Sequence, residues 1–193
     1  MSASFQVIIR YLIYQKNGKV FKQKDIYTKK MVKIEILLRE GKVSRIGELE
    51  KERYVNFFFH SYKDNLQHCR FIIQEFPRWS IISGYYAMHD ITKLFLAKAY
   101  KIKIDVQVHS TTIKALRGLI DNKGIIKLLE AGHNEFIHMA NDLAEAKRER
   151  TKTQYFTGSN YMKSEYRARA QKFLNNKVEP FIAKMDILLE AKR

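Results

Sequence analysis

Residues 83–96, SGYYAMHDITKLFL, decide the fold class of this chain. Apolar side chains lie nearly all round the stretch, which is typical of a helix surrounded by other helices. Gly84 would let a neighbouring helix approach closely, at a cost of about 1 kcal/mol in helix propensity. The stretch therefore predicts that residues 78–100 form the central helix of a bundle.

The His89-Asp90 pair inside this stretch raises the question of catalysis. Adjacent residues on a helix point about 100° apart, so the two side chains cannot act as a base and the carboxylate that orients it. No Ser or Cys of the quoted stretch stands on the same face as a nucleophile. We interpret His89 as a core histidine with one hydrogen-bonded nitrogen, and a functional role is the alternative.

Apolar spacings of three and four predict further helices on both sides. Before the central helix, a long helix runs from Glu48 until Pro77 ends it, because proline disfavours helix at the residue before it. After it, Ser110 or Thr111 is expected to cap a short helix, and DNKG at 121–124 is expected to form a turn. The three apolar stripes are Val55, Phe58, Phe59, Tyr62, Leu66, Cys69 and Ile73; then Ile125, Leu128, Leu129, Phe136, Ala140 and Leu143; then Tyr166, Ala170, Phe173, Leu174, Phe181, Ile182, Met185, Leu188 and Leu189.

These patterns predict an all-α fold, an antiparallel bundle of four or five helices over residues 46–193. Only 2 prolines and 8 glycines interrupt the 193 residues, which favours long helices. Pro180 lies within the last stripe and predicts a kink there. Residues 1–45 form a basic N-terminal extension, in which KNGK at 16–19 indicates either a hairpin turn or a frayed helix. Any sheet is expected within residues 1–30.

Composition also limits the compartment and the cofactors. The single cysteine, Cys69, excludes an internal disulfide framework and any zinc site built on cysteines. No apolar run reaches about 18 residues, and FQVIIRYLIY near the N-terminus lacks a cleavage site, so neither a membrane span nor a signal peptide is predicted. We expect a cytoplasmic protein without a cofactor.

Two histidine patterns were considered as metal sites. Glu135 and His138 have the Glu-x-x-His spacing of di-iron bundles, but such a site needs this motif on two different helices plus two more inward glutamates. The other Glu-x-x-His of the chain, Glu130 and His133, lies on the same predicted helix. His133, His138 and Asp142 would make only a partial site, which an exposed polar face explains better. The sequence predicts no metal.

The formal net charge of +16 favours a polyanionic partner. Neutralising phosphates releases counterions, so nucleic acid or nucleotide is the first candidate, and a solvated lysine-rich surface is the alternative. Residues 147–172 contain eight basic residues, two glutamates and three tyrosines. Basic groups contact phosphates and tyrosine rings offer stacking surfaces for bases, although a polar loop between two solvated helix ends would have a similar composition.

Four segments, taken in order, resemble the HEPN domain family over roughly residues 48–190. They are SGYYAMHDITKLFLAKAYKI from residue 83, HSTTIKALRGLI from residue 109, RERTKTQY from residue 148 and YRARAQKFLNNKVEPFI from residue 166. The resemblance implies an antiparallel helical bundle that forms a two-fold homodimer and is often encoded beside a nucleotidyltransferase. Some members of the family are toxins that cut RNA, and these share an Arg and a later His with four to six residues between them.

The corresponding position in this chain has Arg150 followed by Tyr155, where the RNase members have histidine. This resembles the non-nuclease branch of the family, and a tyrosine with a pKa near 10 is a poor general base at neutral pH. Arg53 and His60 also fit the RNase spacing, but we interpret that match as chance, because short motifs recur at random and this one lies at the wrong end of the bundle.

The sequence therefore predicts a non-catalytic helical module that binds RNA or nucleotide phosphates, together with a nucleotidyltransferase partner. One basic surface is expected to hold phosphate, since FTGSN at 156–160 lets the chain reverse there. Its predicted residues are Arg148, Arg150, Lys152, Tyr155, Arg167 and Arg169. The alternatives are a metal-independent endoribonuclease with Arg150 and Tyr155 in its site, and a purely structural adaptor.

Overall fold

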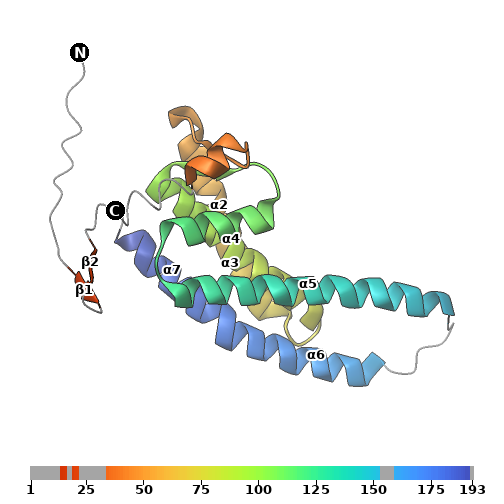
Figure 1. The fold of residues 1–193 in the computed structure, drawn as a ribbon. Coiled ribbons are helices and arrows are strands. Elements are labelled where there is room, and N and C mark those ends of the chain that lie inside the picture. Colours follow the sequence, from red (N-terminus) through yellow and green to blue (C-terminus); the bar gives the residue numbers. More distant parts are fainter. Residues whose placement is uncertain (1–13, 17–18, 22–33, 153–158, 192–193) are drawn as a thin grey trace, which may run out of the picture.

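The computed structural model describes residues 14–16, 19–21, 34–152 and 159–191, and most of them are helical (Figure 1). The prediction of an all-α bundle is confirmed. The helices are α2 (Glu48–Ile72), α3 (Pro77–Tyr100), α4 (Val108–Leu119), α5 (Lys123–Lys152), α6 (Ser159–Phe173) and α7 (Glu179–Glu190), and a π-helical turn (Leu174–Val178) joins the last two. Within these ranges, no helix has the length and apolar character that crossing a membrane would need.

Helix α3 is the centre of the bundle, as the sequence predicted. It contacts α2, α4, α5, α6 and α7, and from Ile81 to Ala97 nearly all its side chains are buried. Gly84 permits this packing, because a Cβ there would lie 3.0 Å from Cys69 Sγ, 3.0 Å from a Val178 methyl carbon and 3.2 Å from the Phe173 ring. The close approach expected at Gly84 is therefore present, and it involves three neighbouring elements: α2, α6 and the π-helical turn.

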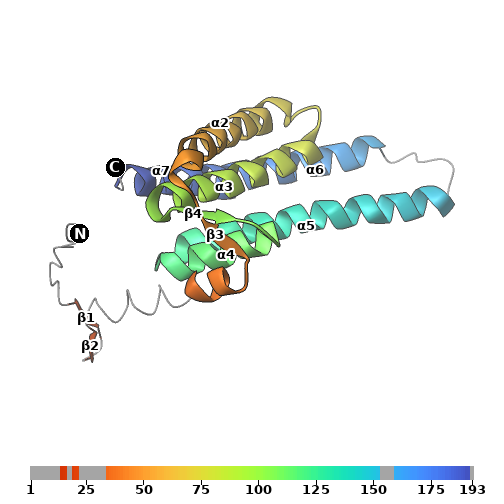
Figure 2. The same cartoon turned by 90° about the horizontal axis from the view of Figure 1, so that it is seen from above.

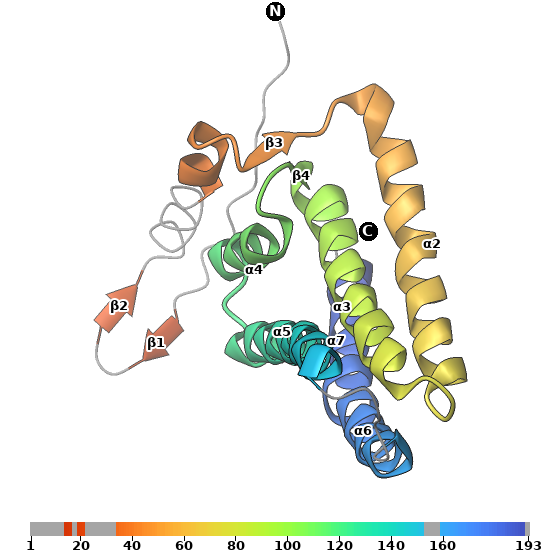
Figure 3. The ribbon, with the colours of Figure 1, turned by 90° about the vertical axis from the view of Figure 1, so that its right-hand side faces the viewer.

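Helices α2 and α3 form an antiparallel hairpin with a short corner (Figure 3). The predicted apolar stripe of α2 faces α3, with Phe58, Tyr62 and Cys69 buried. Helix α2 ends at Ile72, and Pro77 starts α3 in the first helical position, where its missing N–H costs nothing. The sequence thus predicted this boundary from a single proline.

The last apolar stripe is interrupted where Pro180 predicted a kink. The interruption is a π-helical turn, in which the N–H of Glu179 donates to the carbonyl of Leu174. A proline has no N–H to complete the ordinary helical pattern in the turn before it, and a single wider turn is one way to accommodate it. Phe173, Phe181 and Met185 stay buried on both sides of the turn.

A small antiparallel sheet lies outside residues 1–30, so the expectation about sheet was wrong. Strand β3 (Val43–Arg45) pairs with β4 (Ile102–Ile104), with Val43 opposite Ile104. The alternation of lysine and isoleucine in KIKI, at residues 101–104, is the period-two pattern of a strand. Lys101, at φ 55°, ends α3 in the left-handed conformation and turns the chain into β4.

This sheet belongs to a second apolar core. The core joins a short helix at residues 34–39 to the C-terminal end of α3 and to α4. Its buried members are Ile34, Leu37, Val43, Leu96, Ile102, Ala115 and Leu119. Residues 34–45 therefore pack against the bundle, although the sequence placed them in the N-terminal extension.

Two helix starts differ in how well the sequence anticipated them. The expected cap at Ser110 or Thr111 is wrong: α4 begins at Val108 after a left-handed Gln107, and the two hydroxyls donate back to the carbonyls of Gln107 and Val106. The turn expected at 121–124 is shorter than predicted: of its four residues only Asp121 and Asn122 lie between the helices, because α5 begins at Lys123. Asn122 caps α5 by accepting from the N–H groups of Gly124 and Ile125, both at 3.1 Å.

Near the N-terminus, β1 (Tyr14–Lys16) and β2 (Lys19–Phe21) pair antiparallel, with Lys16 opposite Lys19. Of the two alternatives for KNGK, the hairpin is therefore the one observed.

Candidate functional site

The residues predicted to form the phosphate surface come from the end of α5, from α6 and from the segment between them. Arg148, Arg150 and Lys152 lie on the last turns of α5, but their side chains and all of Tyr155 lie outside the described residues. Helices α5 and α6 run in opposite directions and diverge toward their outer ends in Figure 1, and most of the predicted FTGSN break lies outside the described residues.

Arg167 and Arg169 already have partners within the fold. Arg167 donates from Nε and Nη2 to the carbonyl of Gln74, at 3.2 and 2.9 Å, and so binds the α2–α3 corner. Arg169 forms a half-buried ion pair with Glu135 of α5. Because Arg150 lies fifteen residues beyond Glu135 on the same helix, it is separated from Arg169 by about 20 Å along the axis. Arg167 and Arg169 therefore tie α6 to its neighbours.

The structure also brings together three histidines, which the sequence could not pair. His89 of α3, His109 of α4 and His133 of α5 meet at the junction of these helices. The ring centroids of His89 and His109 lie 5.0 Å apart, and those of His109 and His133 lie 5.8 Å apart in a stacked arrangement. The hydroxyl of Tyr85 lies 2.8 Å from Nδ1 of His109, and Phe136 stacks on the Tyr85 ring at 4.8 Å.

His89 is the core histidine with one satisfied nitrogen that the sequence predicted. It is 1% exposed, and its Nε2 lies 3.1 Å from Oγ1 of Thr112. Thr112 donates its only proton to the carbonyl of Val108, so Nε2 of His89 carries the donated hydrogen. Nδ1 has no hydrogen-bond partner among the described residues and lies 3.6 Å from Oδ1 of Asp90, too far for a hydrogen bond.

Burial keeps this histidine cluster neutral at pH 7. Burial first, and then the neighbouring His89, His133 and Lys93, together lower the pKa of His109 to about 4. Burial is also the main cause of the lowered pKa values of His89 and His133. Uncharged imidazoles can accept or donate one hydrogen bond each, which is how the cluster uses Tyr85 and Thr112.

A buried polar network lies between α2 and α3 beside the histidines. Asp90 is 6% exposed and accepts at Oδ2 from the Ser61 hydroxyl at 2.6 Å and the Asn65 amide at 3.1 Å. Lys93, half-buried on the next turn of α3, lies 4.8 Å from the Phe58 ring centroid, and burial lowers its pKa. The network joins the two helices of the central hairpin by polar contacts within an apolar interface.

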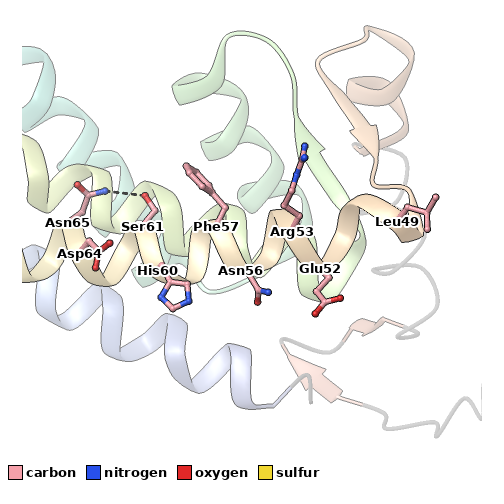
Figure 4. Close-up of a pocket in the computed structure, with 9 residues that line it drawn as sticks. All are labelled: Leu49, Glu52, Arg53, Asn56, Phe57, His60, Ser61, Asp64 and Asn65. Atoms are coloured by element: carbon pink, nitrogen blue, oxygen red, sulfur yellow. Dashed lines mark hydrogen bonds between the residues drawn. The ribbon is translucent and has the colours of Figure 1, made fainter.

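A shallow groove runs along the outer face of α2 (Figure 4). All of its lining comes from that one helix: Leu49, Glu52, Arg53, Asn56, Phe57, His60, Ser61, Asp64 and Asn65. Figure 4 shows the guanidinium of Arg53 and the imidazole of His60 pointing away from each other, in keeping with the interpretation of their spacing as chance.

The described residues contain no cluster of three His, Cys, Asp or Glu side chains that could hold a metal ion. Of the partial site considered in the sequence, His133 belongs to the histidine cluster and His138 is exposed, while the side chain of Asp142 lies outside the described residues.

Comparison with known proteins gives no relative for this chain. No protein-family model, no curated protein and no solved structure matches it significantly, so the resemblance to the HEPN family stays a prediction.

Proposed function

We propose that the chain is a helical module that binds RNA through the basic end of α5 and does not cut it. The observation that carries the proposal is the helical backbone of residues 147–152, which holds Lys147, Arg148, Arg150 and Lys152 within two turns next to the reversal into α6. Basic groups concentrated on one short helical segment suit the closely spaced phosphates of a nucleic acid.

The ion pairs of the described surface support this charge argument. Six of its glutamates are each paired with a lysine or arginine: Glu40 with Lys42, Glu48 with Lys101, Glu50 with Lys103, Glu130 with Arg117, Glu135 with Arg169 and Glu179 with Arg70. The hydrogen-bonded lysines lower the pKa values of Glu40, Glu48 and Glu50. Because these carboxylates already have partners, the excess positive charge has to be balanced by anions outside the chain.

The proposal is non-catalytic because the sequence has no histidine after His138, and so none near this end of α5. Tyr155 stands where the RNase pattern has histidine, and a phenol of ordinary pKa, near 10, is a poor general base at neutral pH. The neutral imidazole of His133 lies seventeen residues before Arg150 on the same helix, about 25 Å along the axis. A homodimer and a nucleotidyltransferase partner, which the resemblance implies, belong to the same proposal.

The test compares retention and cleavage of labelled RNA by the wild-type protein, Arg150→Ala and Arg117→Ala. The last variant is the matched control, since it removes one exposed arginine from α4. We expect RNA retention that weakens as salt rises, falls several-fold in Arg150→Ala and is unchanged in Arg117→Ala, without fragments. Fragments made by the wild type but not by Arg150→Ala would establish the endoribonuclease instead, and no retention at low salt would leave the adaptor.

A further inference from the structure

The α2–α3 corner exposes three large aromatic rings within nine residues. Phe71 is 86% exposed, Phe76 60% and Trp79 59%. No ring–ring or ring–cation contact involves them within the described residues. A monomeric surface rarely leaves several large apolar groups exposed at one place, and such a patch usually marks an interaction site.

These rings stand on a rigid base. Ile72, Ile73, Pro77 and Ser80 point into the core from the same corner and are buried. The N–H of Phe76 donates to the carbonyl of Ile72 at 2.7 Å, and the hydroxyl of Ser80 donates to the carbonyl of Cys69 at 2.7 Å. Because the backbone is held in this way, a ligand that stacks on the rings loses little entropy in ordering them.

Three arginines fix the corner against α6 and α7. Arg70 donates from Nε and Nη2 to Glu179, at 3.0 and 2.9 Å. Arg78 lies over the ring of Tyr166, 4.2 Å from its centroid, and pairs with no carboxylate within the described residues. Arg167 binds the carbonyl of Gln74 with two of its N–H groups. Two glutamates, Glu75 and Glu179, are also present, so the corner is mixed in charge with an excess of guanidinium groups.

The corner and the basic end of α5 lie toward the same end of the molecule. Figures 1 and 2 show the α2–α3 turn beside α6, with the ends of α5 and α6 that flank the chain reversal extending beyond it. A bound strand could therefore contact both regions.

We propose that single-stranded RNA binds the corner, with its bases stacked on Trp79, Phe71 and Phe76 and its phosphates near Arg78. The inference rests on the proposed RNA binding and adds the class of RNA. Exposed aromatic rings among arginines offer stacking surfaces that accept any base, and only an unpaired strand presents free base faces. The high positive charge of the chain favours this polyanion over an apolar protein partner.

Trp79 reports on the corner directly, because it is the single tryptophan of the chain. Short single-stranded oligoribonucleotides are titrated into the full-length protein while tryptophan emission and the anisotropy of labelled RNA are followed. We expect emission to be quenched along the same curve as binding, and a duplex of equal length to quench little. Trp79→Leu and Phe71→Ala should each weaken single-strand binding about tenfold, the loss of roughly one stacked base. Phe57→Ala, which removes a ring 62% exposed on α2, should not.

The outcomes separate this inference from the proposed function. RNA binding that depends on Arg150 but leaves tryptophan emission unchanged, or survives Trp79→Leu, overturns the stacking surface alone. Equal quenching by duplex and single strand overturns the preference for unpaired RNA. Emission that changes with protein concentration, and not with RNA, assigns the corner to a protein contact. Absence of any RNA binding overturns both proposals.

Discussion

The hydroxyl of Tyr85 and Nδ1 of His109 lie 2.8 Å apart across the α3–α4 interface. Tyr85 is fully buried, and burial raises its pKa far above the ordinary value, so it donates its proton to a neutral imidazole. The contact depends on an uncharged His109, which makes the junction of α3, α4 and α5 sensitive to acid.

Stability is therefore expected to fall as the pH drops from about 6.5 to about 4. The lowered pKa of His109 means that the unfolded chain binds a proton in this window while the folded chain does not, so unfolding becomes easier as protons are added. His89 and His133 act in the same direction. After allowance for partial exposure of His109, its share is on the order of 1–2 kcal/mol. Urea unfolding midpoints across this range measure the effect. His109→Gln should flatten the dependence, whereas replacement of the exposed His60 by Gln should leave it unchanged.

Gly84→Val is expected to destabilise the fold by about 2 kcal/mol or more, because the added side chain overpacks the contact with Cys69 and Val178. Gly47→Val is the matched control, since a Cβ at Gly47 meets nothing within 4 Å and its φ is −64°. The melting temperatures of the two variants, compared with that of the wild type, measure the effect. Equal melting temperatures would mean that α3 is not packed as closely as described.

Asp90→Ala is expected to cost about 2–4 kcal/mol. It leaves the Ser61 hydroxyl and the Asn65 amide without their shared acceptor, and it leaves the half-buried Lys93 without a nearby negative charge. The double variant Asp90→Leu with Lys93→Leu should recover part of the loss, because it removes both charges together. A double variant less stable than Asp90→Ala would contradict this account.

Arg169→Ala and Arg150→Ala should affect different properties, the first stability and the second RNA retention. Arg169 pairs with Glu135, so its loss should lower stability by about 1 kcal/mol and leave RNA retention nearly intact. Arg150→Ala should reduce retention and leave the melting temperature unchanged. Parallel melting and filter-binding measurements separate the two. Loss of RNA binding in Arg169→Ala at full stability would restore the single surface that the sequence predicted.

Local chemistry explains what the sequence predicted correctly. Pro77 ended one helix and began the next, Gly84 marked a close approach, and the apolar stripes identified the buried faces of α2 and of the last helix. The strand at Ile102 carried a visible period-two pattern, but three residues are too few to distinguish a strand from a connection without knowing that Val43 lies opposite.

The histidine cluster could not be predicted from spacing. His89, His109 and His133 belong to three different helices, and only tertiary packing brings their rings together. The partners of Arg167 and Arg169 could not be predicted for the same reason. Composition shows a basic segment, but it does not show that Arg167 is hydrogen-bonded to Gln74 and Arg169 to Glu135.

The pairing of β3 with β4 also constrains the order in which the chain can assemble. Residues 43–45 leave the ribosome well before residues 102–104, and the whole α2–α3 hairpin lies between them. The N-terminal segment must therefore wait, with Ile34 and Leu37 uncovered, until the end of α3 has been synthesised. During that interval the nascent chain exposes an apolar surface and an unpaired strand, the features that attract chaperones and promote aggregation.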